Sequence, residues 1–284
     1  MSSVTMEKGR APAKHRGRAK FTARLDNPAG RTLLQISFFA LVLGLWEAGV
    51  RLGLISGFLF GSPFGIGHQL VKGILDGSLL YDTWITLYEA ILGFVIGTIF
   101  GSALGLSLWY SHFVARTVEP LIVAFNSVPK IALAPIIILW FGTGLGAKVA
   151  LAISLTSIVA LIAAYQAAKD ADPDLQSLLL TLGASKKQIF WKVIVPSSLP
   201  SIIATFRINV GFGLVGAVVG EFISSEHGLG HMVFVASSLY DLNSVWAGIF
   251  TLMAIGFVLY FAIDLFERLT LRWKTGDRRR ELHV

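Results

Sequence analysis

Six long apolar segments constrain this chain more than any other feature of its sequence. They lie near residues 33–50, 84–109, 119–141, 147–167, 199–222 and 245–266. A helix needs roughly 20 mostly apolar residues to cross a hydrocarbon core of about 30 Å, and these segments approach or exceed that length. Because hydrophobic residues make up 54% of the chain and charged residues only 14%, most of it must face lipid. The sequence predicts an all-α polytopic membrane protein with six transmembrane helices.

Basic residues are unevenly distributed between the two sides of this predicted bundle. Most lysines and arginines lie in residues 1–31, in residues 268–284 and in the loop between the fourth and fifth spans, whereas the opposite side holds only Arg51, Lys72 and Lys148. Cytoplasmic segments of membrane proteins are enriched in Lys and Arg, so we expect both termini in the cytoplasm. The net charge of +7 is then a topology signal and does not indicate nucleic-acid binding.

The same pattern divides the chain into four parts. We expect a basic cytoplasmic tail at 1–31, a first transmembrane helix with an external amphipathic segment at 32–83, a core transmembrane domain at 84–267 and a second basic tail at 268–284. In the external segment, apolar residues at helical spacing predict a short helix on the membrane surface. These residues are Ile66, Leu70, Ile74 and Leu75.

The loop between the fourth and fifth spans, residues 169–196, has the pattern of two short helices. Asp172 can cap a helix that has Pro173 at its first position, and Gly183 ends that helix as a left-handed glycine does. A second helix follows Ser185, and Pro196 marks the return to the membrane. The apolar positions are Leu175, Leu178, Leu179 and Leu182 in the first helix, and Ile189, Phe190 and Val193 in the second. Two helices joined at a glycine form a rigid knob suited to docking a partner.

The second span carries four glycines at steps of four residues. They are Gly93, Gly97, Gly101 and Gly105. Small residues at this spacing form a ridge that lets another helix approach closely. We therefore expect tight helix packing along this span, inside the bundle or at a subunit interface.

Ionisable residues inside a span are costly and need a role. Lys130 follows Asn126 and Ser127 in the third span, and we expect these three to line the translocation pathway and to favour anions. Alternatively, the helix starts later and Lys130 lies at the cytoplasmic boundary, where it reaches lipid phosphates. Glu221, near the outer end of the fifth span, is a candidate gate or contact for an external protein. A structural hydrogen bond between helices is the other interpretation of Glu221.

Three segments of the chain resemble ABC importer permeases: LGASKKQIFWKVIVP at 182–196, SVPKIALAPIIILWFGTG at 127–144 and GEFISSEHGLG at 220–230. The first is similar to the coupling-loop motif of these permeases, and the other two resemble the nitrate, sulfonate and taurine branch. The family's loop opens with Glu-Ala-Ala, where this chain has Ser177, Leu178 and Leu179. The resemblance implies ATPase coupling through Leu178, Leu179, Leu182, Gly183, Ala184, Ser185, Ile189, Phe190 and Pro196.

What the resemblance implies is a type I importer in a bacterial plasma (inner) membrane. Two copies of the permease form a homodimer, two ABC ATPase subunits dock on the coupling loops, and an external binding protein delivers the substrate. The branch suggests a small anion such as nitrate, a sulfonate, taurine or an organic acid. Relatives that transport pyrimidines or riboflavin are also similar, so a vitamin precursor is the alternative substrate. No GxxxxGK[ST] phosphate loop occurs in the sequence, so ATP and Mg are expected on the partner subunit and no cofactor on this chain.

Two other classes of protein fit parts of the sequence. An ion-gradient-driven secondary transporter would act alone, but no inverted repeat with paired broken helices is evident. A membrane scaffold would not need polar residues such as Lys130 inside a span. Catalytic and metal sites are not indicated, because the chain has no cysteine and its polar residues form no catalytic pattern. His227 and His231 could meet on a helix, but Gly228 and Gly230 argue against one.

Overall fold

The computed structural model describes residues 28–271, which contain helices and turns but no strand. The predicted tails at residues 1–27 and 272–284 lie outside the described residues. The chain divides into two compact units, one ending at Phe64 and one beginning at Gly65. The sequence placed the start of the core domain later, at residue 84.

The first unit contains α2 (Pro28–Arg51) and α3 (Gly57–Phe60). Most side chains of α2 from residue 32 onward are exposed within the unit, as expected for an apolar helix whose neighbours are lipid. Glu47 ties the end of α2 to the following turn. Its carboxylate accepts a 2.7 Å hydrogen bond from Arg51 and a 3.0 Å bond from the Phe64 N–H.

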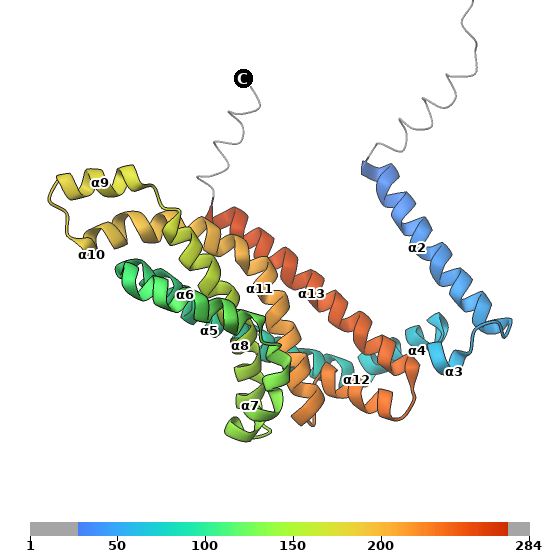
Figure 1. Cartoon of the computed structure of the whole chain (residues 1–284). Helices are drawn as coiled ribbons and strands as arrows, with labels where there is room; N and C mark the ends of the chain where they lie inside the picture. Colours follow the sequence, from blue (N-terminus) through green and yellow to red (C-terminus); the bar gives the residue numbers. More distant parts are fainter. Residues whose placement is uncertain (1–27, 272–284) are drawn as a thin grey trace, which may run out of the picture. The chain divides into compact units, whose positions relative to one another are not determined.

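The second unit is a helical bundle with short helices at both ends (Figure 1). Its long helices are α5 (Ser78–Ser107), α8 (Leu145–Lys169), α11 (Val195–Ser224) and α13 (Leu242–Thr270). Its shorter elements are α4 (Pro63–Leu75, which starts in the first unit), η1 (Leu108–Tyr110), α6 (His112–Ser127), η2 (Lys130–Leu133), α7 (Ala134–Phe141), α9 (Pro173–Thr181), α10 (Lys186–Ile189), the π-helical turn η3 (Phe190–Ile194) and α12 (Leu229–Ser238).

Small residues hold α5, α8 and α11 together. A Cβ atom added to Gly93 or Gly97 would overlap the side chain of Ala152 or Thr156 on α8. At Gly101 the obstacle is backbone, the carbonyl oxygen of Ser157. The glycine ridge predicted on the second span, Gly105 included, therefore lies at a close contact between α5 and α8.

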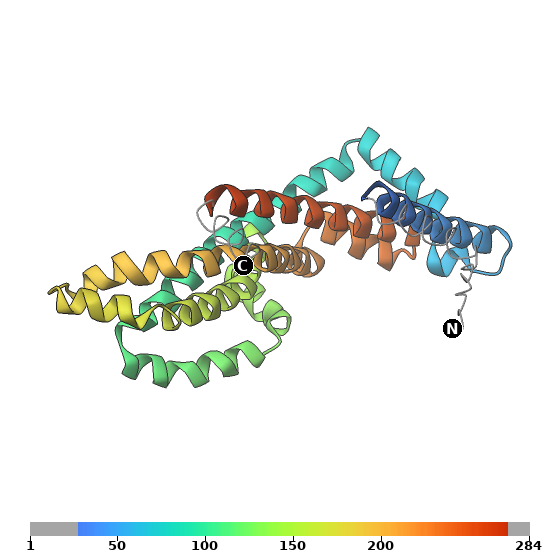
Figure 2. The same ribbon diagram turned by 90° about the horizontal axis from the view of Figure 1, so that it is seen from above.

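The predicted third span is not a straight helix. It consists of α6 and the η2–α7 segment, which are bent by 84° relative to each other. Pro129 lacks a backbone N–H, and its ring keeps the preceding Val128 out of the helical region, at φ −71° and ψ 128°. The prediction of one continuous span at 119–141 was wrong for this reason. Figure 2 shows α6 as an outlying helix beside the bundle, and Ala115 is its one buried residue.

Five helices are long and apolar enough to cross a membrane, and the bent pair makes a possible sixth span. The predicted six-span architecture therefore agrees with the structure, although several boundaries moved. The second span begins at Ser78, six residues before the predicted start, and α12 was not predicted. In α4, only Ile66 of the predicted apolar face is buried, while Ile74 and Leu75 are exposed.

Candidate coupling and translocation sites

The loop after α8 folds as predicted into two short helices, here called the knob (residues 173–194). Asp172 caps α9 by accepting hydrogen bonds from the N–H groups of Asp174, at 2.8 Å, and Leu175, at 3.4 Å. Gly183 adopts φ +77°, a left-handed conformation that glycine takes without steric cost. Ser185 begins α10 with a capping box, exchanging hydrogen bonds with Gln188. Local chemistry alone therefore defines this turn.

The knob separates its apolar residues into a buried and an exposed set. Ile189 and Phe190 are buried in a cluster with Ala168 at the end of α8, and Phe190 also contacts the ring of Tyr110 at a centroid distance of 4.7 Å. Leu179 and Ala184 pack against the same cluster. By contrast, Leu178 is 55% exposed and Leu182 is 73% exposed. The coupling residues predicted from the sequence thus divide into those that anchor the knob and those that are available to a partner.

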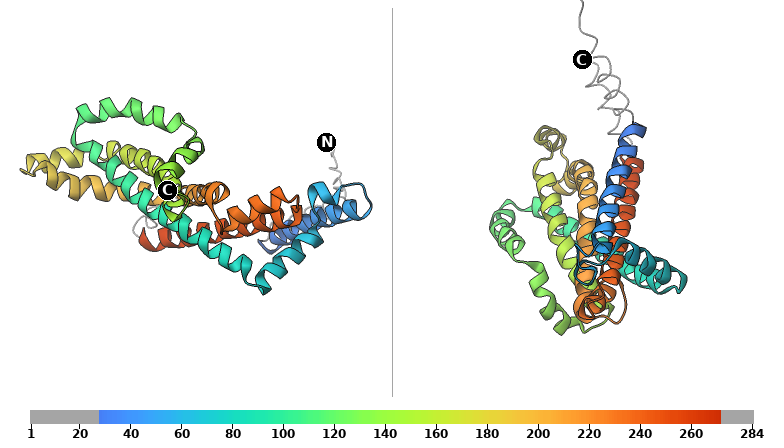
Figure 3. Two further views of the ribbon diagram at one scale, coloured as in Figure 1. Left: turned by 90° about the horizontal axis from the view of Figure 1, so that it is seen from below. Right: turned by 90° about the vertical axis from the view of Figure 1, so that its right-hand side faces the viewer.

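The knob continues into α11 without a break. The sequence predicted a boundary at Pro196, but residues 186–224 form one helical stretch of 39 residues. Pro196 lies in the first turn of α11, directly after the π-helical turn at Phe190–Ile194. A proline is tolerated in a first turn, where a backbone N–H has no partner within the helix. At 1.5 Å per residue this stretch is about 58 Å long. In the left view of Figure 3 the ribbon continues from the knob into the bundle.

Lys130 lies at the bend between α6 and η2. Its Nζ donates hydrogen bonds to the backbone oxygen of Asn126, at 3.2 Å, and to its side-chain oxygen, at 3.3 Å. Ser127 donates to the Val123 carbonyl at 3.0 Å. Asn126 and Ser127 are exposed and Lys130 is half-buried. The three predicted pathway residues thus lie together at the bend, where the side chains of Lys130 and Ser127 are hydrogen-bonded to carbonyl oxygens of α6.

Glu221 is fully buried at the end of the bundle opposite the knob. Its carboxylate accepts 2.7 Å hydrogen bonds from the Thr86 hydroxyl of α5 and from the Gly230 N–H of α12. Gly228 adopts φ +107°, and a Cβ there would overlap this carboxylate. Glu221 therefore joins α5, α11 and α12. In this conformation it could reach a pathway only after these contacts separate.

A buried ion pair between α5 and α8 was not predicted. Lys148 Nζ lies 2.8 Å from Glu89 Oε1, and their side chains are 9% and 3% exposed. The Glu221 carboxylate is also attracted by Lys148 and repelled by Glu89. The sequence placed Lys148 on the external side, at the start of a span expected over residues 147–167, whereas α8 begins at Leu145. Opposite charges in two apolar spans were the signal that could have identified the pair.

Two further polar contacts join helices. Asn209 of α11 donates hydrogen bonds to Thr98 Oγ1, at 2.8 Å, and to the Thr156 carbonyl, at 3.1 Å. Arg207 forms ion pairs with Asp264 and Glu267 of α13, the second at 3.0 Å. Both contacts are structural, and residues 28–271 contain no group of His, Asp and Glu arranged to hold a metal ion.

The bundle thus combines a knob with exposed leucines, one helical stretch over residues 186–224 and buried polar contacts between helices. The family of binding-protein-dependent transport system inner membrane components matches residues 93–272. This chain belongs to that family. It is a permease component of an ABC importer, and its role in the transporter is not the catalytic one.

Relatives with curated names cover most of the permease. It is 34% identical to a formylaminopyrimidine transport permease protein of Halalkalibacterium halodurans, over 84% of this chain and 94% of the relative. It is 32% identical to a riboflavin transport system permease protein of Chloroflexus aurantiacus, over 83% and 88%. With the taurine transport system permease protein of Escherichia coli the identity is 28%, over 84% and 89%.

Solved structures show the same fold. The permease matches a chain of the MetNI methionine ABC transporter in an inward-facing conformation, with a TM-score of 0.61 and 19% identity, over 69% of this chain and 97% of that chain. The type I importer permease fold predicted from the sequence is therefore confirmed.

Proposed function

We propose that this permease acts as a homodimer in a bacterial plasma membrane, with an ATPase subunit docked on each knob and an external binding protein at the opposite end of the bundle. Both termini and the knob lie in the cytoplasm, as the distribution of Lys and Arg indicates. ATP and Mg are bound by the partner subunit. The likeness of fold to a chain of the MetNI methionine ABC transporter supports this arrangement of subunits.

The exposed leucines of the knob carry this proposal. Leu178, Leu180 and Leu182 are 55%, 61% and 73% exposed on a helix outside the apolar spans. Apolar side chains gathered on a protruding element mark an interaction surface. Because Phe190 and Ile189 anchor the knob to α8, a partner that moves these leucines also moves the helix bundle.

Alternating access follows from this connection. Closure of the ATPase dimer pulls on the knob, and the helix at 186–224 carries the motion to Glu221. Separation of Glu221 from Thr86 and Gly230 then frees α5 from α12. The binding-protein end opens while the knob end closes.

For the substrate, we propose a small anion such as a sulfonate, taurine, nitrate or an organic acid. Lys130, Asn126 and Ser127 support this choice, since an ammonium group beside polar side chains at a helix bend favours an anion over a cation or a neutral solute. A pyrimidine or flavin precursor is the second candidate, favoured by the 34% and 32% identity to permeases named for such compounds.

The docking proposal is tested by co-purification of the chain with its ATPase in mild detergent. Leu182→Asp places a charge on the knob, and Leu239→Asp is the matched control, since both leucines are 73% exposed and Leu239 lies at the opposite end of the bundle. We expect Leu182→Asp to weaken ATPase binding at least about tenfold, a change of about 1.4 kcal/mol, and Leu239→Asp to leave it unchanged. Equal binding by both variants would show that the ATPase docks elsewhere.

Uptake by proteoliposomes that contain the complex and binding protein separates the substrate classes. A labelled alkanesulfonate and labelled riboflavin are supplied in parallel, with ATP inside the vesicles. Lys130→Ala should reduce uptake of the anion and leave uptake of the neutral heterocycle intact. Uptake by this chain alone, driven by an ion gradient, would refute the ATP-dependent mechanism.

A further inference from the structure

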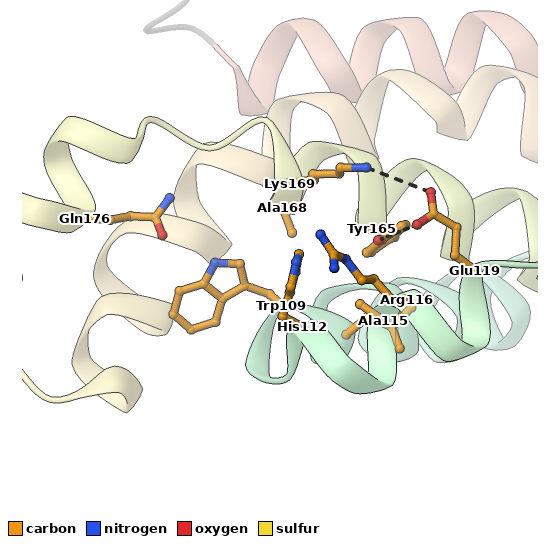
Figure 4. Close-up of a pocket in the computed structure, with 10 residues that line it drawn as sticks. Trp109, His112, Ala115, Arg116, Glu119, Tyr165, Ala168, Lys169 and Gln176 are labelled. Carbon is orange, nitrogen blue, oxygen red and sulfur yellow. Dashed lines mark hydrogen bonds and ion pairs between the residues drawn. The ribbon is translucent and has the colours of Figure 1, made fainter.

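A pocket of about 400 Å³ lies beside the knob, between α6 and the end of α8. This volume falls within the range of about 300–1,000 Å³ that is usual for small-ligand sites. Its wall contains the side chains of Trp109, His112, Arg116 and Lys169 (Figure 4). The pocket contains neither Lys130 nor Glu221. One lining residue, Gln176, belongs to the knob, but the leucines proposed to dock the ATPase are not among the lining residues.

The charges in this pocket do not balance. Glu119 is its one acidic residue, and it is already engaged by the Tyr165 hydroxyl, at 3.3 Å, and by Lys169, at 3.8 Å. Within residues 28–271, the side chain of Arg116 forms no hydrogen bond or ion pair. The pocket therefore presents a free guanidinium beside a neutralised carboxylate.

The neighbouring groups favour the same kind of ligand. His112 is the first residue of α6, so the positive end of that helix dipole lies at the edge of the pocket. Figure 4 shows His112, Arg116 and Lys169 projecting into the same space from α6 and α8. A guanidinium presents paired N–H donors that match the oxygens of a phosphate group.

We propose that this pocket binds a phosphate-bearing anion, with Arg116 as the main contact and His112 and Lys169 beside it. Two sources supply this chemistry: the headgroup of an anionic phospholipid and a soluble phosphate compound. A basic pocket between helices at a membrane surface is suited to a lipid headgroup. Phe113, 79% exposed next to His112, offers an apolar surface to acyl chains.

Binding measurements on the purified full chain test the proposal. Native mass spectrometry measures binding of phosphatidylglycerol, with phosphatidylcholine as the lipid without net charge. Calorimetry measures binding of inorganic phosphate. Arg116→Gln is compared with Lys187→Gln, which removes the same charge from an exposed position outside the pocket. We expect Arg116→Gln to weaken binding at least about tenfold, because a charge-assisted contact is lost, and Lys187→Gln to have no effect.

The outcomes separate the two sources. Arg116-dependent binding of phosphatidylglycerol identifies a lipid headgroup, and Arg116-dependent binding of inorganic phosphate identifies a soluble anion. Hydrogen exchange on the unmodified protein provides a second measurement, since either ligand should slow exchange at residues 112–119 and 165–176. If neither probe binds, if neither slows exchange, or if Arg116→Gln binds as the unmodified chain does, the pocket is not an anion site.

Discussion

Replacement of Lys148 by Met tests the buried ion pair between α5 and α8. The side chains of Lys148 and Glu89 are almost fully buried and their charged atoms are 2.8 Å apart. Loss of the ammonium group leaves the Glu89 carboxylate buried without its cation, and it also removes the positive charge that interacts with Glu221. We expect this single substitution to be strongly destabilising. The double variant Glu89→Met/Lys148→Met removes both charges and conserves volume.

The magnitude follows from the distance and the burial. Two unit charges at 2.8 Å attract by about 6 kcal/mol at an effective dielectric constant of about 20, and the cost of burying both charges offsets most of this attraction. The net value of the pair is therefore small. Removing only one of the two residues costs more, because the other charge stays buried without a partner, which destabilises the fold by about 3–5 kcal/mol.

A double-mutant cycle measures this coupling. Each variant is unfolded reversibly in mixed micelles with an increasing fraction of SDS and followed by tryptophan fluorescence. Lys148→Met should lower the free energy of unfolding by about 3–5 kcal/mol, and the double variant should lower it much less. The exposed control Lys187→Met should stay within about 0.5 kcal/mol of the unmodified chain. If the double variant loses as much as the sum of the two single variants, Glu89 and Lys148 do not stabilise each other and the reasoning fails.

Three further predictions concern helix packing, the knob and the start of α5. Gly101→Ala should lower the free energy of unfolding by about 1–3 kcal/mol in the same assay, because its Cβ would overlap backbone. Gly211→Ala, with open space around it, should raise the free energy of unfolding by about 0.5–1 kcal/mol. Equal effects of the two substitutions would contradict the close approach of α5 and α8. Gly183→Ala should destabilise the knob by about 1–2 kcal/mol, since only the left-handed backbone at φ +77° opposes a Cβ there, and faster amide exchange over residues 173–189 is the measurement; unchanged exchange would show that the turn tolerates an L residue. Hydrogen bonds from the side chain and backbone of Ser78 lower the pKa of Asp76. The ionised Asp76 carboxylate therefore stabilises the turn before α5 at neutral pH, and this stabilisation is lost as the pH falls through the lowered pKa. Protection of amide hydrogens from exchange at the start of α5 should decline with acid, and Asp76→Asn should remove this pH dependence.

Local sequence was sufficient for much of the knob and for the number of spans. Asp172, Gly183 and Ser185 act on backbone groups within a few residues of themselves, so their roles as caps and as a left-handed stop could be predicted from order alone. Apolar length predicted the spans in the same way, because lipid imposes one thickness on every helix that crosses it. The break near Pro129 was missed, although its cause is local.

Tertiary structure decided the contacts between distant segments. Glu89 and Lys148 are 59 positions apart, and a sequence shows that each charge needs a partner without showing which partner it finds. Ile189 and Leu182 have similar hydrophobicity, yet the packing of α8 buries the first and leaves the second exposed. The sequence by itself determined the spans, the caps and the family, since these depend on local composition and order. Only the folded bundle decided which charges pair and which apolar side chains remain available to a partner, because those outcomes depend on how separate helices meet in space.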